Sequence, residues 1–198
     1  MVALAGILAL QGGFEAHERM LARLGARTRQ VRLAADFEGL DGLIIPGGES
    51  TTMWKLLHEE NLVEPLRAFV ASKPVFGTCA GAILLASKVT HPDQEALCAM
   101  DYTAVRNAYG RQIDSRVTVL TPEPEFEDRT EPGDLEAVFI RAPILRDLGD
   151  GVTVLARYLD DPVLVEQGPY LAAAFHPELT DDPRVHSLFL GKLGHATG

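Results

Sequence analysis

Residues 74–87 read PVFGTCAGAILLAS and contain the change of pattern that decides the fold. The apolar run Pro74–Phe76 predicts a buried strand, and the small and aliphatic residues of Ala80–Ser87 predict a helix. Cys79 lies between them, flanked by glycines at the expected turn. A strand that leads directly into a helix is the repeating unit of a parallel sheet covered by helices.

The same alternation runs through the N-terminal half of the chain. Further elements are expected there, namely strands Val2–Leu10, Arg27–Leu33 and Gly42–Ile45 and helices Phe14–Leu24, Thr52–Leu57 and Val63–Ala71. Ser50 or Thr51 is the expected cap of the helix that begins at Thr52. This alternation predicts an α/β fold of three layers, in which helices flank a mainly parallel central sheet.

The C-terminal half has a different pattern. Five strands and a closing helix are expected there, namely strands Arg116–Leu120, Ala137–Ile140, Val152–Tyr158, Pro162–Glu166 and Tyr170–Phe175 and helix Arg184–Leu193. No helical pattern separates the last three strands, which indicates some antiparallel pairing. Thr121–Gly133 is rich in proline and glutamate and predicts an exposed loop. We expect residues 1–198 to form a single domain, because this length fits one α/β core.

The composition narrows the classes of function. The 198 residues carry a formal net charge of −10, which argues against binding to a nucleic-acid backbone. The two cysteines provide neither a disulfide framework nor a zinc cluster, and no metal or cofactor is expected. The apolar N-terminal segment lacks a basic start and is far shorter than a membrane span, so we expect a cytoplasmic protein without membrane contact.

Cys79 lies where an α/β fold places a nucleophile. A glycine stands two residues before it and another two residues after it, as in the sharp turn of a nucleophile elbow. The N-terminus of the following helix favours a thiolate, and the N–H of Ala80 points to where an oxyanion would form. The alternative is a buried structural cysteine, which is our interpretation of Cys98. The motif alone would suit a peptidase, an esterase-like thiol enzyme or an amidase.

A thiol nucleophile needs a base and a group that orients the base. Among the histidines, only His176 follows an expected buried strand and has a carboxylate close by, that of Glu178. Residues two apart share one side of an extended chain, so we expect the two side chains to hydrogen-bond. A surface turn with an incidental histidine and glutamate is the alternative. The other histidines are interpreted as surface or helix residues, with His17 held open because it follows the strand-end glycines.

Two glycine-containing loops follow expected strands. Gly47 and Gly48 leave backbone N–H groups bare, so Gly48 could supply a second oxyanion donor. A phosphate-binding loop is the rival interpretation, but the chain lacks a P-loop lysine and the dinucleotide-binding spacing. A plain turn also stays open. The run Gln11-Gly12-Gly13 holds the equivalent place after the first strand, where a turn and a binding role are about equally favoured.

These motifs together resemble the class I, or triad, glutamine amidotransferases, and within that group the glutaminase subunit of pyridoxal 5′-phosphate synthase. The resemblance covers nearly the whole chain. Its motifs are Leu8-Ala9-Leu10-Gln11-Gly12, Pro46-Gly47-Gly48-Glu49-Ser50-Thr51-Thr52, Gly77-Thr78-Cys79-Ala80-Gly81, Arg106-Asn107-Ala108-Tyr109-Gly110-Arg111-Gln112, Phe139-Ile140-Arg141-Ala142-Pro143 and Phe175-His176-Pro177-Glu178-Leu179-Thr180. The elbow and the His-x-Glu pair are shared by the wider group, whereas the Arg-Asn-Ala-Tyr-Gly-Arg-Gln and Ile-Arg-Ala-Pro runs single out the vitamin B6 branch.

The resemblance implies a reaction and a set of residues. A triad of Cys79, His176 and Glu178 would hydrolyse L-glutamine to L-glutamate and ammonia through a thioester. The glutamine pocket implied in the same way is lined by Gly47, Gly48, Glu49, Arg106, Ile140 and Arg141. A guanidinium can bind both oxygens of a carboxylate, which suits Arg106 to an amino-acid ligand. Without the resemblance, both arginines would be interpreted as members of surface ion pairs.

The resemblance also implies a partner. Ammonia would pass through a tunnel to a (β/α)8-barrel synthase subunit, which makes pyridoxal 5′-phosphate from a pentose phosphate and a triose phosphate in a large hetero-oligomer. Gln11, near the oxyanion loop, is a candidate for sensing that partner. The stretch Thr121–Ala137 is longer and more acidic than the family leads us to expect, which bears on loop structure and the interface.

Three other functions stay open. A glutaminase of the same group could serve histidine or purine synthesis, and activation by candidate synthases would separate these cases. A cysteine peptidase on a similar fold would cleave peptides, whereas a glutaminase releases ammonia from free glutamine. A non-enzymatic binding module is disfavoured by the intact set of Cys79, His176 and Glu178.

Overall fold

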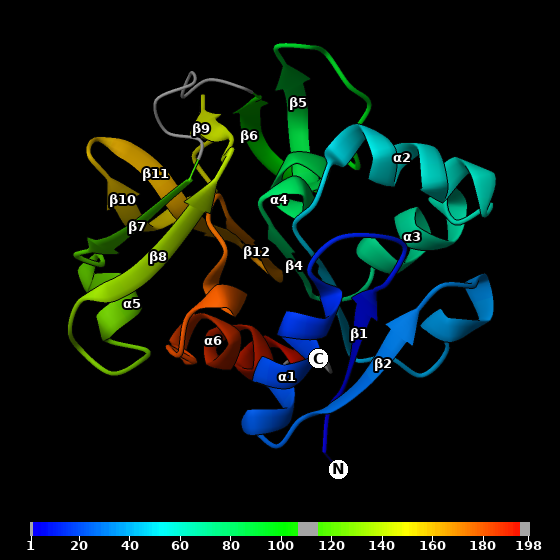
Figure 1. Ribbon diagram of the computed structural model, residues 1–198, viewed down its shortest axis with the longest axis horizontal. Helices are drawn as coiled ribbons and strands as arrows, with labels where there is room; N and C mark the ends of the chain where they lie inside the picture. The colour runs from blue at the N-terminus through cyan, green and yellow to red at the C-terminus, as the bar shows by residue number, and fades with distance from the viewer. Residues whose placement is uncertain (1, 107–114, 195–198) are drawn as a thin grey trace.

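The computed structural model describes residues 2–106 and 115–194. Within these residues, seven strands form a central sheet in the order β10-β11-β12-β4-β3-β1-β2 (Figure 1). The strands are β1 Leu4–Leu8, β2 Arg27–Val31, β3 Gly42–Ile45, β4 Val75–Thr78, β10 Thr153–Tyr158, β11 Asp161–Gln167 and β12 Tyr170–Ala173. Strands β2, β1, β3, β4 and β12 run parallel, whereas β11 is antiparallel to both neighbours. The prediction of a mainly parallel sheet, with some antiparallel strands from the C-terminal half of the chain, is therefore confirmed.

The helices pack on both faces of this sheet. They are α1 Phe14–Arg23, α2 Ser50–Glu59, α3 Val63–Val70, α4 Ala80–Leu85 and α6 Arg184–Leu193. The Phe76 ring of β4 packs against His17 of α1 and His186 of α6. Helices α1 and α6 lie side by side in Figure 1. Gly77 faces the opposite side of the strand. There, a Cβ at Gly77 would come within 2.5 Å of the backbone of Gly81 in α4. The sheet is thus the middle of three layers.

The burial of the strands follows their place in the sheet. Every residue of β3 and β4 is buried, as expected for central parallel strands whose two faces are both covered. Strand β2 lies at the edge and exposes Arg27, while only Val31 is fully buried. The continuous apolar runs in the sequence therefore correspond to the strands that position the site.

Two smaller sheets lie beside the central one. Strands β5 Ala86–Thr90, β6 Met100–Val105 and β9 Ile144–Arg146 form a three-stranded sheet, and β7 Ser115–Leu120 pairs antiparallel with β8 Leu135–Ile140. The sequence patterns did not predict β5, β6 or β9. Strand β8 contacts the segment that follows β12, because the N–H of His176 donates to the carbonyl of Val138 over 2.8 Å.

Several element boundaries differ from the prediction. Strand β4 continues to Thr78, and α4 ends at Leu85 because the following residues pair with β6. The N-cap of α2 is Glu49, not Ser50 or Thr51. Its carboxylate accepts hydrogen bonds from the N–H groups of Thr51 and Thr52 at 3.2 and 2.6 Å. An acidic side chain at this position also interacts favourably with the helix dipole.

The segment predicted as an exposed loop, Thr121–Gly133, contains the short helix α5 Pro124–Glu127. Its Phe126 side chain is fully buried, and the guanidinium of Arg184 lies 5.7 Å from the centre of its ring. Arg184 also donates to the carbonyls of Glu131 and Gly133 over 2.7 and 2.8 Å. The exposed-loop prediction is therefore wrong for this anchored part. Within the residues described, none of the helices has the length and apolar character needed to span a membrane.

Candidate active site

The carboxyl ends of four parallel strands meet at one edge of the central sheet. In β12, Ala173 lies beside Thr78 of β4, and Ile45 of β3 lies beside Gly77 of β4. Strand β1 is the next neighbour of β3. Ligand sites in open α/β sheets form at such ends. The segments that follow these strands carry the sequence-predicted residues Gln11, Gly47, Gly48, Cys79 and His176.

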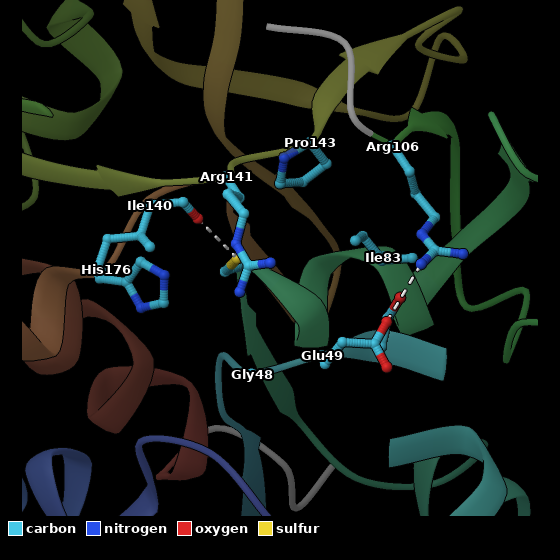
Figure 2. Close-up of a pocket in the computed structure, with 10 residues that line it drawn as sticks. Gly48, Glu49, Ile83, Arg106, Ile140, Arg141, Pro143 and His176 are labelled. Atoms are coloured by element: carbon cyan, nitrogen blue, oxygen red, sulfur yellow. Dashed lines mark hydrogen bonds and ion pairs between the residues drawn. The ribbon is translucent and has the colours of Figure 1, made fainter. Parts of the chain in front are cut away.

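Cys79 occupies a sharp turn between β4 and α4. Its backbone angles, φ 48° and ψ −101°, are rare for a residue with a side chain and store strain. Neighbours fix this conformation: the N–H of Cys79 donates to Ala173 O over 2.8 Å, and its carbonyl accepts from Ile83 N over 3.1 Å. The thiol donates to the carbonyl oxygen of Ile140 over 3.7 Å, the dashed line beside Ile140 in Figure 2. This is the geometry of a nucleophile elbow.

His176 and Glu178 form the hydrogen bond that the sequence predicts. Nδ1 of His176 lies 2.7 Å from Oε1 of Glu178, and both side chains are buried. The local reason differs from the predicted extended chain. Residues Pro177–Leu179 form a 3₁₀ turn, η3, so the turn itself brings the carboxylate back to the imidazole. The carboxylate therefore orients the ring while the other ring nitrogen stays available for chemistry.

The charges of this pair support one another. Burial disfavours a charged His176, but its interactions with Cys79 and Glu178 outweigh that effect and raise its pKa to about 10. Burial also disfavours a charged Glu178, yet His17 and His176 together hold the pKa of this carboxyl below its usual value. An imidazolium next to an ionised carboxylate is thus the favoured state.

The loop after β3 lies directly against these groups. A Cβ at Gly47 would come 2.3 Å from Cε1 of His176 and 3.4 Å from Cβ of Cys79, so only glycine fits. Gln11 holds the loop from the other side. Its side-chain amide donates to Glu49 O over 3.1 Å, and its Oε1 accepts from Glu49 N over 3.4 Å. A Cβ at Gly48 would come 2.3 Å from Nε2 of Gln11, so the loop and this side chain fit closely.

A cavity of about 170 Å³ opens beside Cys79 and His176 (Figure 2). Gly48, Glu49, Arg106, Ile140 and Arg141 line it, as predicted, whereas Gly47 and Ala80 are not among its lining residues. Three further residues, Ser50, Ile83 and Pro143, line the cavity and were not predicted from the sequence. In Figure 2, His176 and Ile140 lie on one side of the cavity, and Arg106 and Glu49 lie on the other.

The wall opposite His176 carries charge. Arg106 Nη2 lies 3.3 Å from Glu49 Oε1 and donates to Thr51 Oγ1 over 3.0 Å. Burial alone would raise the pKa of Glu49, but hydrogen bonds from Thr52 and Thr51 together hold it below its usual value. Arg141 is exposed and has a φ of 45°, a strained value for a non-glycine residue. A carboxylate and two guanidinium groups therefore line one small cavity.

Other sequence interpretations have mixed outcomes. His17 and His186 lie on helices, as one interpretation had it, but both are fully buried rather than at the surface. Cys98 is exposed, which contradicts its interpretation as a buried structural cysteine. Of the Arg106–Gln112 motif, only Arg106 falls within the described residues. Of the three missed lining residues, Ser50 and Pro143 lie in motifs quoted for the resemblance but were assigned no role in the cavity, and Ile83 lies in none of those motifs.

Fold and site together define a class of protein. A strained cysteine at a strand–helix junction, beside a His–Glu pair at the end of the adjacent parallel strand, defines an α/β enzyme of the thiol type. The SNO glutamine amidotransferase family matches residues 7–194 of the chain, and the chain belongs to this family. It is therefore a glutamine amidotransferase, as the resemblance in its sequence indicates.

Curated relatives and solved structures agree with this assignment. The chain is 59% identical over 188 residues to the pyridoxal 5′-phosphate synthase subunit PdxT of Solibacter usitatus, and the match covers 95% of this chain and 98% of that protein. It is 48% identical over 200 residues to a PdxT of Thermus thermophilus, covering 98% and 100%. A crystal structure described as a glutamine amidotransferase superposes with a TM-score of 0.86 at 48% identity, covering 96% of this chain and 98% of that one.

Proposed function

We propose that the protein hydrolyses the side-chain amide of L-glutamine to L-glutamate and ammonia through a triad of Cys79, His176 and Glu178. The observation that carries this proposal is the meeting of the strained Cys79 turn with the hydrogen-bonded His176–Glu178 pair at one cavity. A nucleophile, a base and an orienting group are the three parts that acyl transfer requires.

In the proposed reaction, His176 already holds the thiol proton as an imidazolium, in keeping with its raised pKa, and the ionised sulfur of Cys79 attacks the carboxamide carbon. The charge on the former carbonyl oxygen is stabilised by the N–H groups of Gly48 and Ala80. The carbon–nitrogen bond then breaks, and His176 returns the proton to the leaving nitrogen, which departs as ammonia. Water attacks the resulting thioester and releases glutamate with the free thiol. Glu178 keeps the imidazole in the required tautomer throughout.

The charged wall suits the amino-acid end of glutamine. The carboxylate of Glu49 would accept hydrogen bonds from the α-ammonium group, and Arg106 and Arg141 would bind the α-carboxylate. The Glu49–Arg106 contact of 3.3 Å is between partly exposed groups, so it can open at low cost to admit a ligand. Backbone atoms of Gly47, Gly48 and Ile140 would then fix the carboxamide next to Cys79.

We further propose that the ammonia is delivered to a synthase subunit for pyridoxal 5′-phosphate biosynthesis. Two relatives, at 59% and 48% identity, are named as subunits of pyridoxal 5′-phosphate synthase. We expect the partner to be a (β/α)8 barrel in a large hetero-oligomer, and the complex to work in the cytoplasm. Protonation in bulk water would convert released ammonia to ammonium, which is not nucleophilic, so direct transfer is the chemically sensible route.

Gln11 is proposed to sense that partner. Its amide forms both hydrogen bonds to the backbone of Glu49, next to Gly48 of the proposed oxyanion hole. A partner that engages Gln11 would therefore act directly on the loop. Gln11→Ala should weaken docking or partner-dependent activation. If the variant docks and is activated like the wild type, Gln11 has no sensing role.

The central test is ammonia release from glutamine by the wild type and by Cys79→Ala, each with and without the synthase subunit. Loss of the nucleophile should reduce kcat by at least about 10³-fold. Cys98→Ser serves as the matched control, because Cys98 is an exposed thiol outside the cavity. Equal activity of the wild type and Cys79→Ala would overturn the proposed mechanism.

A further inference from the structure

A row of buried polar side chains continues behind the proposed triad. His17 and His186 are both fully buried, and Nδ1 of His17 lies 2.9 Å from Nε2 of His186. Nε2 of His17 lies 3.1 Å from Oγ1 of Thr78, the residue before Cys79. The same nitrogen lies 3.5 Å from Oε2 of Glu178. Two fully buried imidazoles that only fill space would lower the free energy of unfolding relative to apolar side chains, because each carries polar atoms that need hydrogen-bond partners.

Glu178 needs a second partner on this side. Its Oε1 is occupied by His176, over 2.7 Å. Its Oε2 is buried and, among the described residues, has no hydrogen-bond partner that meets strict geometry. The ring nitrogen Nε2 of His17 lies close to Oε2 on that side and can present an N–H to it. Leaving a buried carboxylate oxygen unpaired costs far more free energy than leaving a neutral group unpaired.

The contacts select one tautomer of His17. If Nε2 carries the proton, it faces the carboxylate oxygen and the Thr78 hydroxyl as a donor, and Nδ1 accepts from His186. In the other tautomer, a lone pair of His17 faces the carboxylate, and His186 keeps a buried N–H at Nδ1, an atom without a partner in the described structure. The first arrangement satisfies more groups and avoids repulsion. His186 thus fixes the proton of His17 on the side of Glu178.

We propose that His17 is a positioning residue of the active site: through Nε2–H it holds the second oxygen of Glu178, so that the first oxygen stays aligned with His176. The inference rests on the proposed hydrolytic function and extends the row of interacting groups to Cys79, His176, Glu178, His17 and His186. It assigns a role in catalysis to a residue of α1, on the far side of the carboxylate from the cavity.

The ionisation of these groups agrees with the geometry. Burial lowers the pKa of His17, although the Glu178 carboxylate opposes this effect, so the imidazole is neutral and acts as a hydrogen-bond donor. Burial, together with the nearby His17, also lowers the pKa of His186 well below its usual value. On the outer side, Arg19 of α1 and Glu136 of β8 line the same surface hollow as Glu178. In this row Glu178 therefore carries the negative charge, and it faces the positive charge of protonated His176.

A matched pair of substitutions isolates the contact. In His17→Gln, the side-chain amide nitrogen can occupy the place of Nε2 and still donate to Glu178. In His17→Asn, the shorter amide replaces Nδ1 and keeps only the side facing His186. Both variants are polar and of similar size, so they should fold comparably, and circular dichroism and thermal melting would verify this.

The first measurement is glutaminase activity in the presence of the synthase subunit. We expect His17→Asn to lower kcat about 10- to 100-fold with little change in KM, as loss of a hydrogen bond to a charged group would. His17→Gln should retain most of the wild-type kcat. Equal kcat values in the wild type and His17→Asn, or equal losses in the two variants, would refute the positioning role.

The second measurement does not depend on glutamine. Iodoacetamide alkylates the thiolate of Cys79 with release of iodide, and a Cys98→Ser background removes the exposed thiol. If His17 aligns Glu178, the profile of alkylation rate against pH should move to higher pH in His17→Asn and move less in His17→Gln. Unmoved profiles would overturn the inference. If all proteins alkylate as expected but release no ammonia, the proposed function fails and the positioning role stands.

Discussion

The two sides of the cavity hold their polar groups in different ways. On one side, His176 and Glu178 are buried, with side chains 10% and 1% exposed, and are joined by a hydrogen bond of 2.7 Å. On the other side, Arg106 and Glu49 are 13% and 45% exposed, and their ion pair measures 3.3 Å. Partly exposed ion pairs contribute little net free energy, whereas buried charges depend on their partners. The first side is built to keep one geometry, and the second is built to exchange partners.

The largest effect is expected from the buried side. Glu178→Gln would present an amide N–H to Nδ1 of His176 and favour the tautomer whose other nitrogen cannot accept the thiol proton. We expect kcat to fall by about 10³- to 10⁴-fold with KM little changed, by analogy with serine-protease triads. Steady-state glutaminase kinetics with the synthase subunit would measure this. A kcat within tenfold of wild type would show that the carboxylate is not needed to orient His176.

A second test forces the loop after β3 away from His176. In Gly47→Ala, the new Cβ would lie 2.3 Å from Cε1 and 2.9 Å from Nδ1 of His176, so the ring or the loop must move. A displacement of about 1 Å at a reacting group can reduce the rate about 10²-fold. Gly191→Ala is the matched control, because a Cβ there meets nothing within 4 Å. If both variants keep wild-type kcat, the tight packing of the loop against His176 has no catalytic importance.

The charged wall should respond in KM rather than in kcat. Arg106→Ala removes a guanidinium proposed to bind the α-carboxylate of glutamine, and we expect KM to rise about tenfold or more with kcat within a few-fold. Arg67→Ala is a suitable control, since Arg67 forms an ion pair of 2.8 Å with Glu95 and does not line the cavity. A fall in kcat with unchanged KM would instead show that Arg106 acts in the chemical step, like the His176–Glu178 side of the cavity.

The smallest effect is expected in the free energy of unfolding, whose dependence on pH reports directly on the buried charges. The pKa of His176 is raised from an ordinary 6.5 to about 10. A raised pKa means that the folded state binds the proton more tightly, so the stabilisation is complete below about pH 6.5 and is lost as the pH rises toward about 10.

Chemical denaturation at several pH values would test this expectation. The free energy of unfolding of the wild type should fall, relative to that of His176→Asn, between these two limits. The difference reports on His176 together with its partners Cys79 and Glu178, because the remaining titrating groups are common to both proteins. A difference that is constant with pH would mean that the imidazole gains nothing from Cys79 and Glu178 in the folded state.

Local sequence patterns predicted the elements that depend on neighbouring residues. Strand β3 and helix α6 have the predicted bounds, because each is a continuous pattern ended by a turn signal. Strands β5, β6 and β9 were missed. Residues 86–90 follow a helix without a break and become a strand only because β6 lies beside them. A pairing partner in another part of the chain leaves no signal in the short strand itself.

The candidate site divides in the same way. Cys79, its flanking glycines and the His176–Glu178 pair were found from sequence because a sharp turn and a two-residue spacing are local requirements. The resemblance to a family, and not physical reasoning, pointed to Arg106 and Arg141. Ile83 lines the cavity with no feature that distinguishes it from a core residue, and Pro143, although it ends the Ile-Arg-Ala-Pro run, was assigned no role there.

The sequence by itself therefore determined the class of fold and the family and predicted a candidate nucleophile, because the alternation of apolar runs and the elbow motif each lie within a few consecutive residues. Only the tertiary structure decided what surrounds that nucleophile. It placed Arg106 against Glu49, 57 residues away in the chain, and His17 against His186, 169 residues away. Such contacts depend on the order of strands in the sheet and on how helices pack over it, which no local pattern specifies.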